Sequence, residues 1–123
     1  MSDIKFNSQI CANLKQSKRL LELGLKPETA DMYIFDDEVY IGKPNVDDIP
    51  AWSLHRLIEM SPTVITHDDY SLILGINATC VYYADDEYAE TFKAFEGNLY
   101  DCVVKCIEWL IKEGYFNKEY LKQ

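Results

Sequence analysis

The segment from residue 98 to 113 has the strongest helical pattern in the chain, and it constrains the fold most. Its polar side chains follow each other at spacings of four, three and four residues and therefore form one solvent-exposed stripe: Asp101, Lys105, Glu108 and Lys112. The apolar residues fill the rest of the helix surface: Leu99, Cys102, Val103, Val104, Cys106, Ile107, Trp109, Leu110 and Ile111. An apolar arc of this width predicts a helix that lies across a sheet and ends at Gly114. The four polar residues are also spaced for two ion pairs within the helix, Asp101 with Lys105 and Glu108 with Lys112.

Alternating side chains indicate strands in the middle of the chain. In residues 70–76 the even-numbered side chains project to one side of a strand, and residues 79–84 run back with Val81 and Tyr83 on one face. Shorter strands are predicted at residues 32–35, 39–41, 63–66 and 88–92. Acidic turns join several of these strands, because aspartate tolerates turn geometry and stays solvated there.

Two further helices are predicted at residues 8–23 and 52–60. Asn7 or Ser8 is the expected cap of the first, Gly24 its end, and Pro62 follows the end of the second. Residues 44–50 read as a loop. The pattern therefore predicts a single domain over residues 1–123 with an α+β fold, in which an antiparallel sheet of about four to six strands carries three helices and the C-terminal helix packs across one face.

The charge of the chain is concentrated in its middle. Thirteen acidic and two basic residues give residues 31–90 a net charge of −11, against −9 for the whole chain. Nucleic-acid binding requires clustered lysine and arginine, so we expect no direct contact with nucleic acid. A protein partner that carries basic residues fits this charge better.

The N-terminal residues and the short apolar runs predict a cytoplasmic protein, and the expected state of the cysteines follows from that compartment. No apolar segment follows a basic N-terminal one, and no apolar run approaches the roughly 20 residues of a membrane span. In that compartment Cys11, Cys80, Cys102 and Cys106 are expected to be reduced. The last two are spaced for one face of a helix and would supply half of a zinc site, but no second Cys/His pair completes it. We therefore expect no metal and no cofactor, and buried thiols instead.

Tyrosines lie beside the acidic turns and point to an interaction surface. Tyrosine combines a large ring with a hydroxyl group, which suits protein interfaces. The predicted partner surface therefore combines both residue types: Asp36, Asp37, Glu38, Tyr40, Asp68, Asp69, Tyr83, Asp85, Asp86 and Tyr88. The paired acids lack the spacing of a calcium-binding loop, and the alternative reading is a solvated rim.

No catalytic residue is predicted, since neither histidine lies in a nucleophile signature and the glycines are too scattered for a phosphate-binding loop. The preferred hypothesis is a non-enzymatic, acidic interaction protein. One alternative is a small hydrolase or metal-dependent enzyme that uses His67 with Asp68 and Asp69. Another is a self-associating structural protein, a homodimer formed through a strand edge or through the end at Tyr115 and Phe116.

Three segments carry a resemblance to known sequences: Leu25–Met32, Ile49–Leu54, and Cys106–Leu110 with Gly114-Tyr115 after it. Their order resembles a group of small uncharacterised proteins encoded by prophages and mobile elements of gut bacteria. The resemblance implies that this chain is encoded by a phage or mobile element, and it transfers no catalytic residue. Together with the preferred hypothesis, this context makes the chain an accessory factor of such an element that docks on a protein partner. The shared segments themselves have the character of structural elements.

Overall fold

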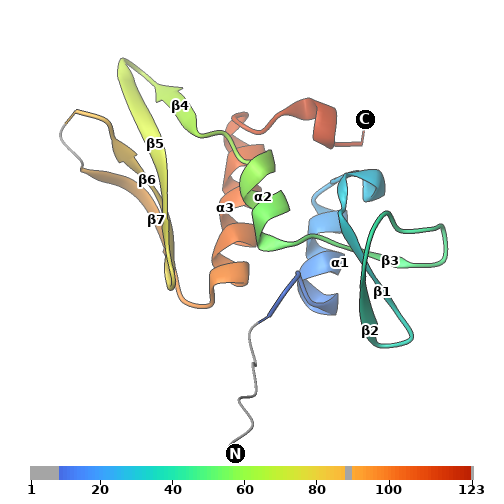
Figure 1. Ribbon diagram of the computed structural model, residues 1–123. Coiled ribbons are helices and arrows are strands. Elements are labelled where there is room, and N and C mark those ends of the chain that lie inside the picture. The colour runs from blue at the N-terminus through green and yellow to red at the C-terminus, as the bar shows by residue number, and fades with distance from the viewer. Residues whose placement is uncertain (1–8, 88–89, 123) are drawn as a thin grey trace, which may run out of the picture.

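Helix α3 (Leu99–Glu113) lies at the centre of the molecule, with other elements packed on both of its sides (Figure 1). The computed structural model describes residues 9–87 and 90–122. The Asn98 side chain accepts a hydrogen bond from the Asp101 N–H at the start of α3, and Gly114, at φ 81°, ends the helix as predicted. The buried residues of α3 are Tyr100 and, from the predicted apolar arc, Cys102, Val103, Val104, Cys106, Ile107 and Leu110.

The fold is α+β, and its strands are divided between two antiparallel sheets. The first sheet has the order β2-β1-β3 and the second the order β4-β5-β6-β7. Their bounds are β1 Met32–Phe35, β2 Glu38–Ile41, β3 Ile49–Ala51, β4 Val64–His67, β5 Tyr70–Asn77, β6 Cys80–Asp85 and β7 Thr91–Glu96. Helix α3 packs on β6 and β7 of the four-stranded sheet, so the prediction that the C-terminal helix covers one sheet face is confirmed.

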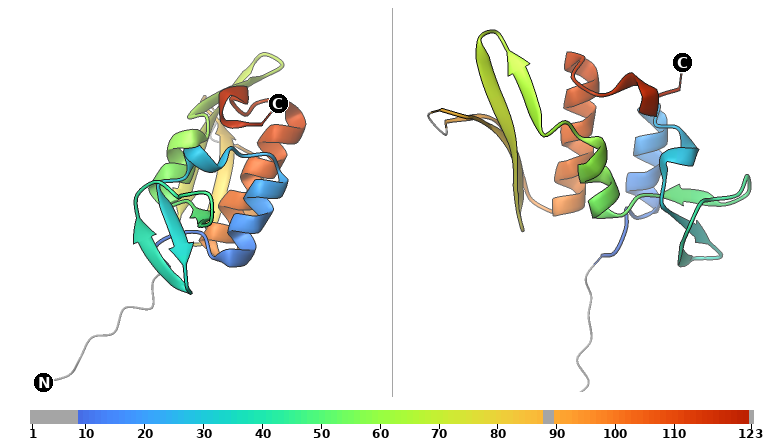
Figure 2. Two further views of the ribbon diagram at one scale, coloured as in Figure 1. Left: turned by 90° about the vertical axis from the view of Figure 1, so that its right-hand side faces the viewer. Right: turned by 45° about the horizontal axis from the view of Figure 1, so that its top comes forward.

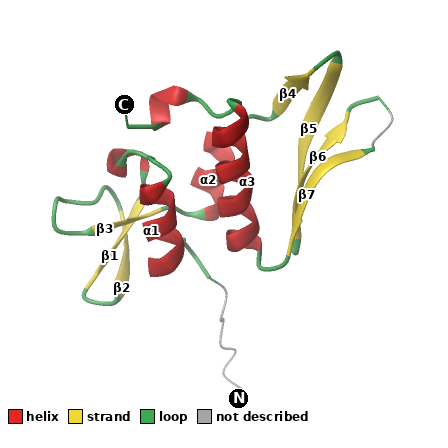
Figure 3. Cartoon of the chain, turned by 180° about the vertical axis from the view of Figure 1, so that it is seen from behind, coloured by secondary structure: helices red, strands yellow, loops and turns green. Residues whose placement is uncertain are grey.

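The helices form a layer between the two sheets. Figure 2 shows the three-stranded sheet in front of the helices and the four-stranded sheet behind them, and Figure 3 shows the same order from the back. Helix α1 (Leu14–Glu22) packs on both α3 and β3, while α2 (Leu54–Met60) packs on α3. One hydrophobic cluster joins the helices to the four-stranded sheet, and a smaller cluster of Cys11, Met32 and Ala51 lies under the three-stranded sheet. No helix within the described residues is long and apolar enough to cross a membrane.

Helix α1 starts later than the sequence pattern predicts. Its cap is Asn13, which exchanges hydrogen bonds with Gln16: the Asn13 side chain accepts from the Gln16 N–H at 2.8 Å, and the Gln16 side chain accepts from the Asn13 N–H at 3.0 Å. This reciprocal capping satisfies two N–H groups at the helix start. Ile10, which lies within the predicted helix range of 8–23, precedes the helix and is exposed, and the expected caps Asn7 and Ser8 lie outside the described residues. The prediction of a helix from residue 8 is therefore wrong for residues 9–13.

Contacts between α1 and α3 replace the ion pairs expected within α3. Asp101 accepts a hydrogen bond from the Gln16 side-chain amide at 2.7 Å, and Glu108 pairs with Arg19. Both acids were expected to bind lysines one turn away on α3. The packing of α1 alongside α3 gives them partners on a neighbouring helix instead.

The three segments that carry the sequence resemblance lie around the core. The buried indole of Trp52 donates a hydrogen bond to the Thr29 hydroxyl at 3.0 Å, and that hydroxyl donates to the Lys26 carbonyl at 2.6 Å. Asp31 accepts hydrogen bonds from the backbone and the hydroxyl of Ser53, which caps α2. Residues 27–29 form a short 3-10 helix, and β3 occupies residues 49–51, where the sequence pattern predicts a loop. These contacts assign the first two segments a structural role.

Replacing Thr29 by valine is expected to destabilise the fold. The Thr29→Val side chain keeps the shape but offers no acceptor, which leaves the fully buried indole N–H of Trp52 unsatisfied. The expected loss of unfolding free energy is about 1–3 kcal/mol, measured by urea denaturation. In the matched variant Thr29→Ser the hydroxyl remains, and the loss should be about 1 kcal/mol or less, from one methyl group. An equal loss in both variants would show that the hydrogen bond is not the cause.

Candidate functional site

The residues predicted to form one partner surface lie on two separate sheets. Asp36, Asp37, Glu38 and Tyr40 belong to the turn and second strand of the β1–β2 hairpin. Asp68 and Asp69 form the turn between β4 and β5, while Asp85 and Asp86 lie at the end of β6. The helical layer separates these two groups (Figure 1). A single acidic face rich in tyrosine is therefore not formed, because the strands that carry it are divided between two sheets.

Two tyrosines of the predicted partner surface are not part of the surface that the structure describes. Tyr88 lies outside the described residues. Tyr83 is fully buried, and its hydroxyl donates a hydrogen bond to the Pro62 carbonyl at 2.7 Å. Burial raises the pKa of the Tyr83 phenol well above its usual value. The assignment of Tyr83 to the surface is wrong because the alternation in β6 turns Val81 and Tyr83 toward α3.

A tight turn shapes the β1–β2 hairpin. Asp36 and Asp37 lie between the strands with φ of 51° and 63°, a left-handed geometry that aspartate tolerates better than most residues. The turn aligns Tyr33 opposite Tyr40, whose rings stack at 5.3 Å between centroids. The Tyr40 hydroxyl donates a hydrogen bond to Glu38 at 3.0 Å, and this bond raises the pKa of the phenol.

The β1–β2 hairpin and the loop after it expose large apolar side chains. Ile41 is 87% exposed, Val46 100% and Phe35 54%, while Val39 and Tyr40 are also exposed. On one face of the hairpin Tyr33, Phe35 and Tyr40 line a shallow depression of about 240 Å³ together with Asn45 and Asp48. The apolar surface is therefore bordered by carboxylates, a composition that favours a docking surface over a merely solvated turn.

Strand β2 is an edge strand with one side open for pairing. In this antiparallel pair the positions that bond across to β1 alternate with positions that direct their backbone groups away from it. Phe35 and Glu38 close the two-residue turn and so form a bonded pair, which makes Val39 and Ile41 the outward positions. The Gly42 N–H, one position beyond Ile41, donates to the Asp31 carbonyl, as this alternation requires. Val39 and Ile41 therefore direct their N–H and carbonyl groups away from β1.

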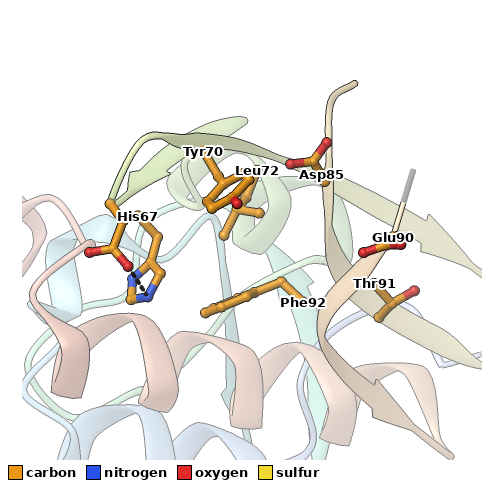
Figure 4. A pocket seen from close by; sticks show the side chains of 8 residues that line it. His67, Tyr70, Leu72, Asp85, Glu90, Thr91 and Phe92 are labelled. Atoms are coloured by element: carbon orange, nitrogen blue, oxygen red, sulfur yellow. Dashed lines mark ion pairs between the residues drawn. The ribbon is translucent and has the colours of Figure 1, made fainter. Parts of the chain in front are cut away.

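The other acidic turns border a cleft of about 560 Å³ beside the four-stranded sheet. Its walls come from β4, β5, the end of β6 and β7, and its lining residues are His67, Asp68, Tyr70, Leu72, Asp85, Glu90, Thr91 and Phe92 (Figure 4). Nδ1 of His67 lies 2.7 Å from the Tyr115 hydroxyl, and Nε2 lies 3.7 Å from a carboxylate oxygen of Asp68. The structure thus brings together His67 and Asp68, as the enzymatic alternative requires. Asp69 is not among the lining residues.

A bulge in β7 turns Phe92 into this cleft. Tyr83 pairs with Lys93 whereas the next residue, Ala84, pairs with Thr91, so Phe92 is the extra residue of β7. Its ring centre lies 4.7 Å from that of His67 and 6.3 Å from that of Trp109. The sequence pattern did not identify Phe92 or Glu90 as site residues. A bulge depends on how β7 pairs with β6, and strand alternation alone carries no signal for it.

The cysteines behave as buried apolar residues. Cys11, Cys102 and Cys106 are buried and all four thiols are free. Burial raises the pKa of the Cys106 thiol from 9.0 to about 12, and the neighbouring Cys102 adds to the rise. Within the described part of the chain, no three His, Cys, Asp or Glu side chains are grouped so that they could hold a metal ion. The thiols of α3 therefore stay protonated at neutral pH and pack against the sheet.

No protein-family model, curated protein or solved structure matches this chain. The geometry of its own residues therefore has to carry any functional assignment. Two surfaces are available for that purpose, the β1–β2 hairpin and the cleft at the far side of the helical layer.

Raising the pH above 9 is expected to destabilise the protein through Cys106. Between pH 9 and about 12 the thiol of the unfolded chain loses its proton while the folded one keeps it. The native state then binds more protons than the unfolded state, so stability falls as pH rises, by at most about 1.4 kcal/mol per pH unit for one group. Urea denaturation across this range should show a shallower fall for Cys106→Ala than for the wild type.

The comparison between the two proteins reports the Cys106 thiol together with its effect on Tyr83, because Cys106 contributes to the raised pKa of the Tyr83 phenol. Burial also raises the pKa values of Cys102 and Tyr83, and both contribute to the pH dependence of the wild type and the variant. If the two proteins lose stability with pH at the same rate, the buried thiol of Cys106 is not responsible.

Proposed function

We propose that this chain is a non-enzymatic, acidic interaction protein, an accessory factor of a phage or mobile element, which docks through its β1–β2 hairpin. Its partner is a protein with a basic segment that adds as a strand along β2. The observation that carries the proposal is the open edge of β2, where exposed apolar side chains and outward backbone groups occur together. The proposal places the protein in the cytoplasm, and its genomic context follows from the sequence resemblance.

The edge of β2 has the features that strand addition uses. An added strand would pair with the N–H and carbonyl groups of Val39 and Ile41, and main-chain bonds of this kind supply affinity. Side chains at alternate positions supply specificity, and both faces of β2 offer apolar contacts through Val39, Tyr40 and Ile41. Proteins usually protect such an edge with lysine, proline or a covering segment. Within β2 the one charged residue is Glu38.

The negative charge of the β1–β2 hairpin and its following loop favours a basic partner. Residues 33–48 contain five acids and one lysine, a net charge of −4. Pairing two copies of this chain edge to edge would bring two such segments together and repel them. A basic segment gains from the same field, both in its rate of encounter and in its choice of register. Of the two contacts suggested for self-association, the end at Tyr115 and Phe116 offers little surface, because Phe116 is buried and Tyr115 is half-buried.

A pair of synthetic strand-forming peptides tests this proposal directly. A peptide of alternating lysine and valine is expected to bind, and binding should slow hydrogen exchange at the amides of Val39 and Ile41. Its glutamate–valine counterpart should not bind. Neutralising the turn with Asp36→Asn and Asp37→Asn keeps residues that tolerate left-handed geometry, and it should weaken lysine-peptide binding by roughly fivefold to tenfold. Raising the salt concentration from about 0.05 M to about 0.5 M should weaken it as well.

A matched variant separates the hairpin from acidic surface in general. The double variant Asp68→Asn and Asp69→Asn removes the same charge from the turn of the other sheet and should leave peptide binding unchanged. Ile41→Pro places a residue without an N–H at the open edge and should abolish the protection. Equal losses in the two aspartate variants, protection elsewhere in the chain, or dimerisation of the protein through β2 alone would each contradict the proposal.

A further inference from the structure

The cleft beside the four-stranded sheet combines charge and apolar surface in an ordered way. Figure 4 shows His67 at one end and the carboxylates of Asp85 and Glu90 at the other, with Tyr70, Leu72 and Phe92 between them. Asp68 lies beside His67, with 3.7 Å between the carboxylate oxygen and Nε2. The cleft therefore carries carboxylates at both ends and an apolar, largely aromatic middle.

Contacts with neighbouring side chains hold the residues in the middle of the cleft in place. The bulge in β7 turns Phe92 toward His67, and Trp109 of α3 supports the Phe92 ring from behind. Tyr115 holds the His67 ring through the 2.7 Å hydrogen bond at Nδ1, and its own ring packs on Trp109. Leu72 is buried at the base. Its volume of about 560 Å³ lies within the range of sites for small ligands, roughly 300–1,000 Å³.

Apart from His67, the ionisable side chains that line the cleft are acidic: Asp68, Asp85 and Glu90. The nearest lysine in the sequence, Lys93, is not a lining residue, and its ammonium group lies over the Phe95 ring. Residues 57–92 contain seven acids and no lysine or arginine. Asp85 lines the cleft and accepts a hydrogen bond from the Glu87 N–H at 2.9 Å. Anionic ligands are repelled from such a site. Aromatic rings, by contrast, attract cations through their negative faces, and carboxylates accept hydrogen bonds from ammonium groups.

We propose that this cleft binds a linear aliphatic diamine or polyamine, with one ammonium group between Asp85 and Glu90, the methylene chain along Leu72, Tyr70 and Phe92, and a second ammonium group at Asp68. The order of charge, apolar surface and charge along the cleft is also the order of groups in such a molecule. A compact metal ion would use neither the aromatic walls nor the length of the cleft. This site is independent of the β1–β2 hairpin, from which the helical layer separates it (Figure 1).

The experiment compares ligands that differ by one charged end. Cadaverine, an unbranched diamine, should bind about tenfold more tightly than pentylamine, which has the same chain and one amine. Spermidine should bind at least as well as cadaverine. Binding is measured by calorimetry, and proton NMR should show shifts of the Tyr70 and Phe92 ring signals.

Variants then test each end of the cleft. Asp68→Asn should remove the advantage of cadaverine and leave pentylamine binding nearly unchanged, because Asp85 and Glu90 offer the stronger end. Glu90→Gln should weaken both amines by about fivefold. The control is Asp37→Asn, which changes a second turn aspartate of positive φ on the other sheet and should affect neither amine.

Three results would overturn the proposal. The first is no binding of cadaverine to the wild type together with unshifted ring signals. The second is equal affinity for cadaverine and pentylamine, which indicates no second ammonium site. The third is an equal effect of Asp37→Asn and Asp68→Asn, which indicates general attraction to an acidic surface. Both substitutions are conservative and lie in exposed turns, so the folded state is retained for the comparison.

Discussion

The burial of α3 on both of its sides is the constraint on which the rest of the structure depends. Trp109 contacts Tyr83 and Phe95 of the four-stranded sheet, while Asp101 and Glu108 bind Gln16 and Arg19 of α1. A helix with one apolar face would accept one layer and leave the other side to water. Because the apolar arc of α3 is broader, the chain needs cover on both sides of it, and α1 with the three-stranded sheet supplies the second layer. The two functional surfaces are separated as a consequence.

Residues 25–32 and 49–54 belong to this scaffold. Thr29 and Asp31 hold Trp52 and Ser53, and Arg56 completes the junction by donating to the Thr29 carbonyl at 2.8 Å while lying over the Tyr120 ring. Buried indoles and caps of this kind tolerate little change, because each exposes an unsatisfied polar group when altered. These residues hold the fold together, whereas the β1–β2 hairpin and the cleft lie mostly outside the segments that contain them.

Much of this fold was open to prediction from local patterns, and the parts that were not depend on pairing between distant residues. The α3 bounds and the acidic turn at Asp36 follow from spacing and turn chemistry close in sequence. The division into two sheets does not, because alternation predicts a strand without naming its neighbour. Tyr83 illustrates the limit: alternation placed it with Val81 on one face, but only the position of α3 shows that this face is buried. Phe92 lines the cleft because of a bulge in β7, and strict alternation of side chains along a strand does not predict a bulge.

The carboxylates of the β1–β2 hairpin and those of the cleft favour different ligands, because different side chains surround them. At the β1–β2 hairpin the acids border an open strand edge, where backbone groups repeat along a line and favour an extended chain. At the cleft they lie at the two ends of an aromatic slot, an arrangement that suits a molecule with a charged group at each end. The negative net charge of residues 31–90 is common to both surfaces, so it distinguishes positively charged ligands from negatively charged ones and no more. Specificity comes from the arrangement of apolar groups between the charges, which is what the division into two sheets provides.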